Sequence, residues 1–221
     1  MQKQLVKTGD GSHSFYLPEM DEHYHSKHGS IAESQHIFIQ SALLYKAKET
    51  EQLKVFEVGM GTGLNVYLTA LTAQKNKLKI EMHSIEAYPI KIEEAKKLNY
   101  AEILEESASI FYQIHESSWE ELHKINNYFH LLKINDQLEN FNLKESYDLI
   151  YFDAFAPEKQ EELWSPEIFK KLYKALNANG ILVTYCVKGI IRRRLQENGF
   201  KIEKLKGPVG GKREMLRAIK V

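Results

Sequence analysis

The sequence lacks the features that mark secreted, membrane-spanning or disulfide-stabilised proteins. Cys186 is its single cysteine, which excludes an internal disulfide and a zinc site built from several cysteines. No run of 18 apolar residues is present to span a bilayer, and Met1–Gln4 does not open an apolar signal segment. We therefore expect a protein of the reducing cytoplasm that has no membrane partner.

The sequence also has no formal net charge, because 30 Lys and Arg residues balance 30 Asp and Glu residues. The two kinds of charge are unevenly distributed along the chain. Residues 188–221 hold eleven Lys or Arg and three Glu, a net charge of +8, which leaves −8 on residues 1–187. Such asymmetry is typical of a chain that binds a polyanion. The alternative is that these cations only solvate surface helices and strands.

The chain has few proline and glycine residues, 5 and 12, and 43% of its residues are hydrophobic, which is typical of a globular domain. Short apolar runs alternate with amphipathic segments from residue 53 onward. The apolar runs predict strands over 53–58, 79–85, 128–134, 147–152, 181–187, 200–205 and 214–219. The amphipathic segments predict helices over 30–47, 64–74, 89–98, 118–127, 165–176 and 190–198.

Strands that alternate with helices predict an α/β, Rossmann-like fold with a mostly parallel seven-stranded sheet. The last two strands have no helix between them, so we expect them to form an antiparallel edge pair. Residues 1–50 are expected to be an N-terminal extension that packs on the site, and residues 51–221 the main domain. Ser30 and Glu33 fit a capping box at the start of the helix in the extension.

Acidic residues follow the predicted parallel strands. Glu57, Glu86, Asp136 and Asp153 stand at or just after four strand ends. The carboxyl ends of parallel strands meet at one edge of a sheet, where ligands of such folds bind. One acidic residue at a strand end is common, whereas four beside a glycine turn are less easily accidental. We therefore predict a ligand site at this edge.

The glycine turn Gly59–Gly63 follows the first strand of the predicted domain. Its glycines allow a sharp turn and a close approach to a ligand, although an ordinary tight turn is the alternative. Glu86 is spaced to meet a ribose hydroxyl pair, and Asp136 could accept a hydrogen bond from an adenine amino group. The turn reads G-x-G-x-G rather than G-x-G-x-x-G, so S-adenosylmethionine, a sulfonium with an amino-acid tail, is favoured over a dinucleotide.

Asp153 opens the segment Asp-Ala-Phe-Ala-Pro after the fourth predicted strand. A carboxylate there could orient an amine and take its proton, because an amine must be neutral to attack a methyl carbon. Phe155 could stack on a planar base. The alternative for Phe155 and Trp164 is packing in the core, and Cys186 is interpreted as a small buried hydrophobe.

Three histidines, His23, His25 and His28, lie close together in the extension. Their spacing needs an extended chain and no second ligand cluster is evident, so we predict no metal site. Near the end of the chain, the Gly-rich loop 207–213 could present Lys212 and Arg213 to phosphates. A flexible hairpin loop is the alternative for that segment.

These motifs together resemble the MnmC-like methyltransferase family. This family is the S-adenosylmethionine-dependent half of the bifunctional enzyme that completes 5-methylaminomethyl-2-thiouridine at the wobble position of tRNA. The resemblance is carried by Phe56–Asn65, Asp153–Pro157, Trp164–Glu167, Gly189–Phe200 and Lys212–Met215. It runs from about residue 20 to the end, although residues 99–127 match poorly and Met60 stands where an aromatic residue is expected.

The resemblance implies a class I methyltransferase fold and methyl transfer to the aminomethyl nitrogen of the wobble uridine. Asp153 would be the catalytic residue at the amine. The expected cofactor-binding residues are Glu57, Gly59, Gly61, Thr62, Gly63, Asn65, Glu86 and Asp136. The expected substrate-binding residues are Tyr24, Ser26, Phe155, Pro157, Lys212 and Arg213.

The sequence matches nothing of the family's FAD-dependent oxidase half, which predicts a standalone methyltransferase supplied with its amine by another enzyme. Two other functions stay open at this point. One is an aminopropyltransferase or a small-molecule amine methyltransferase on the same fold. The other is a non-catalytic RNA-binding module. Salt-dependent binding of tRNA would separate the first from the tRNA enzyme, and binding of S-adenosylmethionine would exclude the second.

Overall fold

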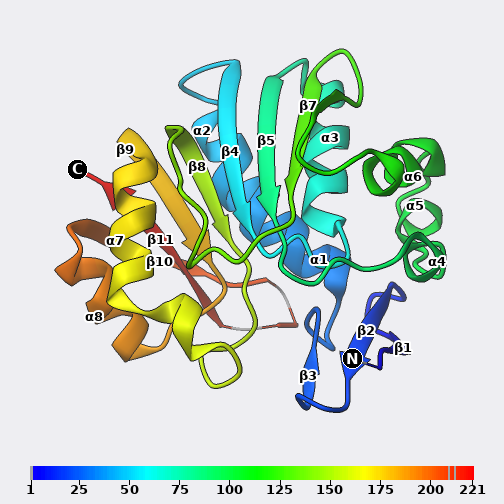
Figure 1. Ribbon diagram of the computed structural model, residues 1–221, viewed down its shortest axis with the longest axis horizontal. Coiled ribbons are helices and arrows are strands. Elements are labelled where there is room, and N and C mark those ends of the chain that lie inside the picture. The colour runs from blue at the N-terminus through cyan, green and yellow to red at the C-terminus, as the bar shows by residue number, and fades with distance from the viewer. Residues whose placement is uncertain (1, 209, 212) are drawn as a thin grey trace.

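The computed structural model describes residues 2–208, 210–211 and 213–221. Its centre is an eight-stranded sheet of order β10-β11-β9-β8-β4-β5-β7-β6, flanked by helices (Figure 1). Neighbours among β4, β5, β7, β8 and β9 are parallel, whereas β6, β10 and β11 run antiparallel to their neighbours. The strands are β4 (Gln52–Val58), β5 (Lys79–Ile85), β6 (Leu122–Lys124), β7 (Phe129–Ile134), β8 (Tyr147–Phe152), β9 (Leu176–Thr184), β10 (Phe200–Lys206) and β11 (Glu214–Lys220).

The α/β architecture with a mostly parallel sheet and the antiparallel edge pair β10–β11 are as predicted. Helices cover both faces of the sheet, and no helix of the described residues is long and apolar enough to cross a membrane. The helical segments are α1 (Ser30–Ser34), the π-helix η1 (Gln35–Leu43), α2 (Leu44–Lys46), α3 (Leu64–Asn76), α4 (Ile92–Ala95), α5 (Tyr100–Ile103), α6 (Ala108–Glu116), the 3-10 helix η2 (Glu161–Trp164), α7 (Pro166–Ala175) and α8 (Gly189–Glu197).

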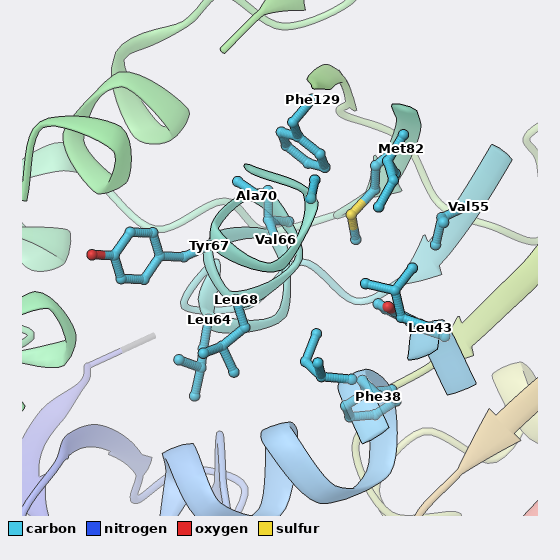
Figure 2. Close-up of a cluster of buried hydrophobic side chains, with 14 of the residues drawn as sticks. Phe38, Leu43, Val55, Leu64, Val66, Tyr67, Leu68, Ala70, Met82 and Phe129 are labelled. Carbon is cyan, nitrogen blue, oxygen red and sulfur yellow. The ribbon is translucent and has the colours of Figure 1, made fainter. Parts of the chain in front are cut away.

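The central strands are buried on both sides, and their side chains alternate between two cores. In β4, Val55 joins the core under α3 and η1, while Phe56 and Val58 join the core under α7 and α8. Figure 2 shows the first core, in which side chains of α3 meet Phe38 and Leu43 of η1 and Val55, Met82 and Phe129 of the sheet. The site edge therefore rests on strands that are held from both faces.

The eighth strand corrects the prediction of a helix over 118–127 and of seven strands. Residues Leu122–Lys124 form β6, which pairs antiparallel with β7. Glu120 has a φ of 63°, a left-handed conformation that interrupts a helix, and its N–H donates to the carbonyl of Lys133. Tertiary pairing with the sheet therefore overrides the local helical pattern. The predicted helix over 89–98 is likewise reduced to the single turn of α4.

The first 29 residues contain a small antiparallel sheet that the sequence did not reveal. Its strands are β1 (Gln4–Lys7), β2 (His13–Leu17) and β3 (Glu22–His23), and it lies below the carboxyl ends of β4 and β5 in Figure 1. The helix predicted over 30–47 is present as three consecutive helical segments, α1, η1 and α2, of which η1 is a π-helix.

The predicted capping box at Ser30 is wrong. Helix α1 begins after Gly29, and neither Ser30 nor Gly29 caps it through a side chain. Asp10 from the loop between β1 and β2 supplies a partner instead, because its Oδ2 accepts the N–H of Ala32 over 3.0 Å. Glu33 accepts the N–H of Ser26 over 3.2 Å. The cap therefore comes from a distant segment, which local sequence spacing cannot reveal.

Candidate active site

A cavity opens at the carboxyl edge of the sheet, where the predicted site residues were expected to meet. We call it the strand-end cavity. It is bounded by the ends of β4, β5, β7 and β8 and by the segment after β3. The predicted site residues that line it are Tyr24, Gly59, Gly61, Glu86, Asp136, Asp153 and Phe155.

The glycine turn forms one wall of the strand-end cavity. Gly59 and Met60 both donate their N–H groups to the carbonyl of Ile85, which fixes the turn against β5. Gly59 has a φ of 86°, and a Cβ there would lie 2.7 Å from the carbonyl oxygen of Asp153. This position therefore requires glycine both for its backbone conformation and for the close approach of β8.

Glu86 connects the glycine turn with the loop that follows β5. Its Oε2 accepts the N–H of Gly61 over 2.9 Å, and its Oε1 accepts the N–H of Tyr88 over 2.9 Å. The amide of Asn135 donates to the carbonyl of Glu86, which holds the ends of β5 and β7 together. The Glu86 carboxylate is thus oriented by backbone donors from two segments and is held at the cavity wall.

The polar and apolar groups that line the strand-end cavity fit an adenosyl group. Two carboxylates, Glu86 and Asp136, can accept hydrogen bonds from ribose hydroxyls and an adenine amino group. Ile85 and Leu138 supply apolar surface for a purine ring, and Tyr88, 57% exposed, stands at the wall of the same cavity. The glycine turn presents backbone rather than bulky side chains to this space.

Asp153 directly follows β8 and lines both the strand-end cavity and a neighbouring one. Its backbone N–H donates to the carbonyl of Val58, so its position depends on the pairing of β8 with β4. Asn65, in the first turn of α3, donates from Nδ2 to Asp153 Oδ2 over 2.8 Å. The side chain of Asp153 is therefore oriented by the helix that follows the glycine turn.

Four residues predicted to bind the cofactor lie behind the cavity rather than on its wall. Among the residues that the structure describes, the two cavities at this edge are not lined by Glu57, Thr62, Gly63 or Asn65. Glu57 and Thr62 are completely buried, and Gly63 precedes α3 with a φ of 75°. These residues support the turn and Asp153, and direct contact with a cofactor stays a prediction for them.

The second cavity, which we call the acidic cavity, lies on the other side of Asp153. It is shared between the extension and the loop after β8, and Tyr24, His25, Asp153, Ala154 and Phe155 line both cavities. Its walls add the carboxylates of Glu22 and Glu33, with Ser26, Lys27 and Tyr185. Burial, and then the negative charge of Asp153, raise the pKa of the Tyr185 phenol far above its usual value. Carboxylates on several sides suit a basic ligand.

Aromatic rings of the extension and of the β8 loop meet at the junction of the two cavities. Tyr24 packs edge-on against Phe155 with ring centroids 5.2 Å apart, and against Phe15 at 6.2 Å. A Cβ on Gly61 would lie 3.2 Å from the Tyr24 ring. Phe155 is only partly buried, whereas Trp164 is completely buried and donates from its indole N–H to the Phe155 carbonyl. Trp164 is therefore a core residue that positions the loop.

Thr62 is the centre of a polar cluster under the glycine turn. His25 Nε2 lies 2.7 Å from Thr62 Oγ1, and Tyr100 donates its phenol to the same oxygen over 3.1 Å. His115 Nε2 lies 3.2 Å from the Thr62 carbonyl. Burial lowers the pKa of both imidazoles to about 4, so both are neutral at pH 7. The cluster ties the extension and α6 to the turn.

The other predicted substrate residues are dispersed. Ser26 lines the acidic cavity, and Pro157 is half-buried in the β8 loop, away from both cavity walls among the residues described. Arg213 is exposed just before β11. Because β11 runs antiparallel to β9, with Leu216 opposite Thr184, the loop before it lies at the carboxyl edge of the sheet. Lys212 lies outside the described residues.

The histidines of the extension have separate surroundings. His23 packs on Tyr16 with ring centroids 4.6 Å apart and lines the acidic cavity, while His25 contacts Thr62 and His28 is exposed. Among the described residues, no three His, Cys, Asp or Glu side chains are placed to hold a metal ion. Cys186 is buried in the core, as interpreted from the sequence.

The basic C-terminal segment is only partly available for a ligand. Arg217 bonds Glu203 and stacks 3.6 Å from the Tyr45 ring centroid, and Arg194 donates to the carbonyl of Trp164. Lys204 pairs with Glu214, and Lys220 donates to the Leu176 carbonyl. Several of the segment's positive charges therefore stabilise the fold. The exposed cations include Arg193, Lys201, Lys206 and Arg213.

Sequence reasoning missed several residues that build this site. Tyr100 and His115 lie in the region that matched the family poorly, and no local pattern marks them as partners of Thr62. Glu22, Glu33 and Tyr185 reach the acidic cavity from three separate segments. Apart from the general excess of negative charge before residue 188, no sequence signal could have found them.

The doubly covered parallel sheet, the glycine turn and the acidic strand ends define a class I methyltransferase. The chain belongs to the S-adenosyl-L-methionine-dependent methyltransferase family, whose match covers residues 90–221, more than half of the chain. Its cofactor is S-adenosylmethionine, which supplies an electrophilic methyl group. The residues that line the strand-end cavity agree with this family identification.

Similar proteins include the tRNA 5-methylaminomethyl-2-thiouridine biosynthesis bifunctional protein MnmC of Leptospira interrogans, 30% identical over 219 residues. The protein of the same name from Campylobacter fetus is 31% identical over 217 residues. The matches cover 90% and 95% of this chain but 32% and 34% of those proteins, so the chain spans about a third of their length. The resemblance to this family predicted from the sequence is thus confirmed.

Solved structures give the same fold. MNMC2 from Aquifex aeolicus is 25% identical, has a TM-score of 0.77, and matches 98% of this chain and 69% of that one. Spermidine synthase from Thermotoga maritima is 14% identical and has a TM-score of 0.58. The match covers 100% of this chain and 72% of the spermidine synthase chain. The second likeness concerns the fold alone.

Proposed function

We propose that this enzyme methylates the exocyclic nitrogen of 5-aminomethyl-2-thiouridine at the wobble position of tRNA. The observation that carries the proposal is the placement of Asp153 between the strand-end cavity and the acidic cavity. An acceptor in the acidic cavity would meet the methyl donor at this carboxylate. The names of the similar bifunctional proteins, which refer to tRNA and to 5-methylaminomethyl-2-thiouridine, support the identity of the acceptor.

The acidic cavity suits an amine on chemical grounds. Glu22, Glu33 and Asp153 line it, and a protonated amine entering it would be attracted by these carboxylates. The amine must lose a proton before it can act as a nucleophile, and Asp153 is the group placed at the boundary with the donor site. In this proposal Asp153 orients the nitrogen and accepts its proton, directly or through water.

The aromatic junction supplies a surface for the base. Phe155 is partly exposed to both cavities and is held edge-on by Tyr24. Stacking of a nucleobase on such a ring contributes roughly 1–3 kcal/mol. Arg213 at the same edge of the sheet, with Lys212 beside it in the sequence, is proposed to contact the phosphates of the anticodon stem-loop. A tRNA substrate would place the enzyme in the cytoplasm.

The other predicted site residues have supporting roles in this proposal. Glu86 and Asp136 would hold the ribose and adenine of the cofactor, with Gly59 and Gly61 beside it. Glu57, Thr62, Gly63 and Asn65 would support the turn and the catalytic carboxylate from behind. Residues 1–50 would act as an extension that closes the acceptor side, with Tyr24 and Ser26 at the acceptor. Pro157 would shape the loop that carries Phe155.

The direct test is methyl transfer from labelled S-adenosylmethionine to tRNA that carries 5-aminomethyl-2-thiouridine. Mass analysis of wobble nucleosides should show the methylaminomethyl product with the wild-type enzyme and none with Asp153→Ala. Putrescine in place of tRNA tests the small-molecule alternative. Methylation of putrescine but not of tRNA, or label elsewhere in the tRNA, would show that the acceptor is wrong.

A further inference from the structure

A single helical turn follows β7 and forms part of the wall of the strand-end cavity. Phe141 donates its N–H to the carbonyl of Gln137 over 2.9 Å, and Asn140 donates to the same oxygen over 3.1 Å. We call residues 137–141 the β7 turn, and residues 136–139 all line the cavity. Three of the five residues of the turn are exposed. An isolated helical turn is marginal in water, so the β7 turn needs support from outside itself.

Lys171 of α7 supplies that support. Its Nζ donates to the carbonyls of Leu138 over 2.7 Å, Glu139 over 2.8 Å and Phe141 over 3.1 Å. The last carbonyls of a helical turn have no N–H partner within the turn, and an ammonium group can donate one hydrogen to each of three acceptors. The positive charge also interacts favourably with the carbonyl end of the turn. One side chain therefore caps the whole turn.

Lys171 and the β7 turn are both attached to the core under α7. Ile168 and Leu172 of α7 are buried there, and Lys171 itself is only partly exposed. Leu138, 3% exposed, and Phe141 attach the turn to the same core. Apolar contacts hold the turn against the helix but do not set the direction of its peptide groups. The directional hydrogen bonds from Lys171 do.

The β7 turn is connected to Asp136, the carboxylate that would accept the amino group of adenine. The N–H of Gln137, at the start of the turn, donates to Asp136 Oδ1 over 2.7 Å. The orientation of the Asp136 carboxylate therefore depends on the orientation of the turn. Leu138 of the same turn adds apolar surface to the cavity. Both groups expected to meet the purine are thus placed by one short segment.

We infer that Lys171 is a positioning residue for the adenine end of the S-adenosylmethionine site. The contacts run from the Lys171 ammonium through the carbonyls of the β7 turn to the Gln137 N–H and the Asp136 carboxylate. A fixed carboxylate at this point matches the 6-amino group of adenine and repels a 6-oxo group. The inference rests on the part of the proposed function that places adenine at Asp136, and it is independent of the methyl acceptor.

The binding test compares two ligands that differ at one edge of the purine. S-adenosylhomocysteine carries a 6-amino group, and S-inosylhomocysteine carries a 6-oxo group in its place. The wild-type protein should bind the adenosyl ligand roughly 10–100-fold more tightly, the range for a hydrogen bond to a charged group. Calorimetry gives both Kd values without tRNA.

Lys171→Met keeps an unbranched side chain of similar length and removes the donors. It should bring the two Kd values to within about threefold of each other, mainly by weakening the adenosyl ligand. Lys171→Arg keeps a cation with several N–H donors and should keep most of the wild-type preference. The inference is overturned if the Met variant keeps the full preference, or if the Arg variant loses as much of it as the Met variant.

Asp136→Asn separates this inference from the placement of the adenine. An amide can accept from a 6-amino group or donate to a 6-oxo group, so this variant should lose the preference if adenine lies at Asp136. If Asp136→Asn loses the preference and Lys171→Met keeps it, only the role of Lys171 is wrong. If Asp136→Asn keeps the preference, adenine lies elsewhere, and both the proposed placement and the inference are wrong.

Hydrogen exchange examines the β7 turn in the absence of any ligand. Lys171→Met should raise the exchange rates of the Asn140 and Phe141 amides by about tenfold or more, because the turn loses three hydrogen bonds. The amides of β7 should exchange as in the wild type. Lys170→Met, at an exposed position of the same helix, is the matched control and should change neither the exchange nor the preference. Unchanged exchange in Lys171→Met, or equal effects of the two variants, would also overturn the inference.

Discussion

His25 Nε2 and Thr62 Oγ1 lie 2.7 Å apart, which joins the N-terminal extension directly to the glycine turn. Tyr100 donates to the same threonine oxygen, so the Thr62 hydroxyl hydrogen is directed to His25. The imidazole must be neutral to accept that hydrogen. Tyr24 directly precedes His25 in the sequence and lines both cavities. The bond between His25 and Thr62 therefore also helps to place the Tyr24 ring.

The neutral histidines predict an acid-sensitive fold. Burial lowers the pKa of His25 and of His115 to about 4, whereas an unfolded histidine titrates near 6.5. Between these pH values the unfolded chain binds more protons, so the free energy of unfolding should fall as pH drops from 6.5 towards 4. Each histidine contributes up to about 1.4 kcal/mol per pH unit, and its contribution is complete above 6.5.

Urea unfolding of wild type and His25→Gln across this pH range measures the effect. The Gln variant should show a shallower decline in the free energy of unfolding, because one titrating group is removed. His28→Gln, at an exposed neighbouring position, is the control and should keep the wild-type decline. Identical slopes for all three proteins would contradict a His25 that is neutral in the folded protein.

Asp153→Ala should abolish methyl transfer while leaving the affinity for S-adenosylmethionine within a few-fold of wild type. The carboxylate lines both cavities, and its removal would take away the group that receives the amine proton in the proposed function. Single-turnover kinetics and calorimetry measure the two quantities separately. A variant that methylates at the normal rate would show that the role assigned to Asp153 is wrong.

Glu86→Gln should weaken S-adenosylmethionine binding roughly 10–100-fold. Both carboxylate oxygens of Glu86 accept backbone N–H groups, from Gly61 and Tyr88, and an amide can satisfy only one of them. Loss of a hydrogen bond to a charged group costs about 1.5–3 kcal/mol. Calorimetry gives the Kd, and Glu93→Gln, exposed on α4, is the control. An unchanged Kd in Glu86→Gln would exclude Glu86 from the cofactor site.

Phe155→Leu should raise the KM for tRNA by roughly tenfold, within the 1–3 kcal/mol expected for stacking on one base. The affinity for S-adenosylmethionine should stay the same if Phe155 contacts only the acceptor. Phe141→Leu, a partly buried aromatic residue packed on the core under α7, is the matched control. If both variants shift the KM equally, the effect comes from packing and not from stacking.

Joint replacement of Lys212 and Arg213 by Gln should weaken tRNA binding and reduce the steepness of its salt dependence. Removal of one ion pair with a phosphate lowers the slope of log K against log salt by about 0.7–0.9. Lys48→Gln with Lys79→Gln removes the same charge from exposed positions before β4 and at the start of β5, at the opposite edge of the sheet. If this control pair reduces the slope as much, the Gly-rich loop does not bind tRNA specifically.

Much of the fold could be predicted because its signals are local. Buried strands such as β4 and β8 are short apolar runs with an acid at or just after the carboxyl end, and the glycine turn marks the start of α3. The residues at 118–127 have no such signal, and their pairing with β7 depends on a strand that follows them in sequence. The helix predicted there was wrong for that reason.

The candidate site, like the fold, has one part that could be predicted from the sequence and another that could not. That Gly59, Glu86, Asp136 and Asp153 lie close together follows from the order of strands along the chain, because parallel strands bring their carboxyl ends to one edge of the sheet whatever the details of packing. Which acids face the cavities and which one is buried could be seen only in the folded chain, because it depends on strand register and on the helix that covers the sheet. It places Glu57 between Ser84 and Tyr151 beneath α3, and His25 of the extension against Thr62.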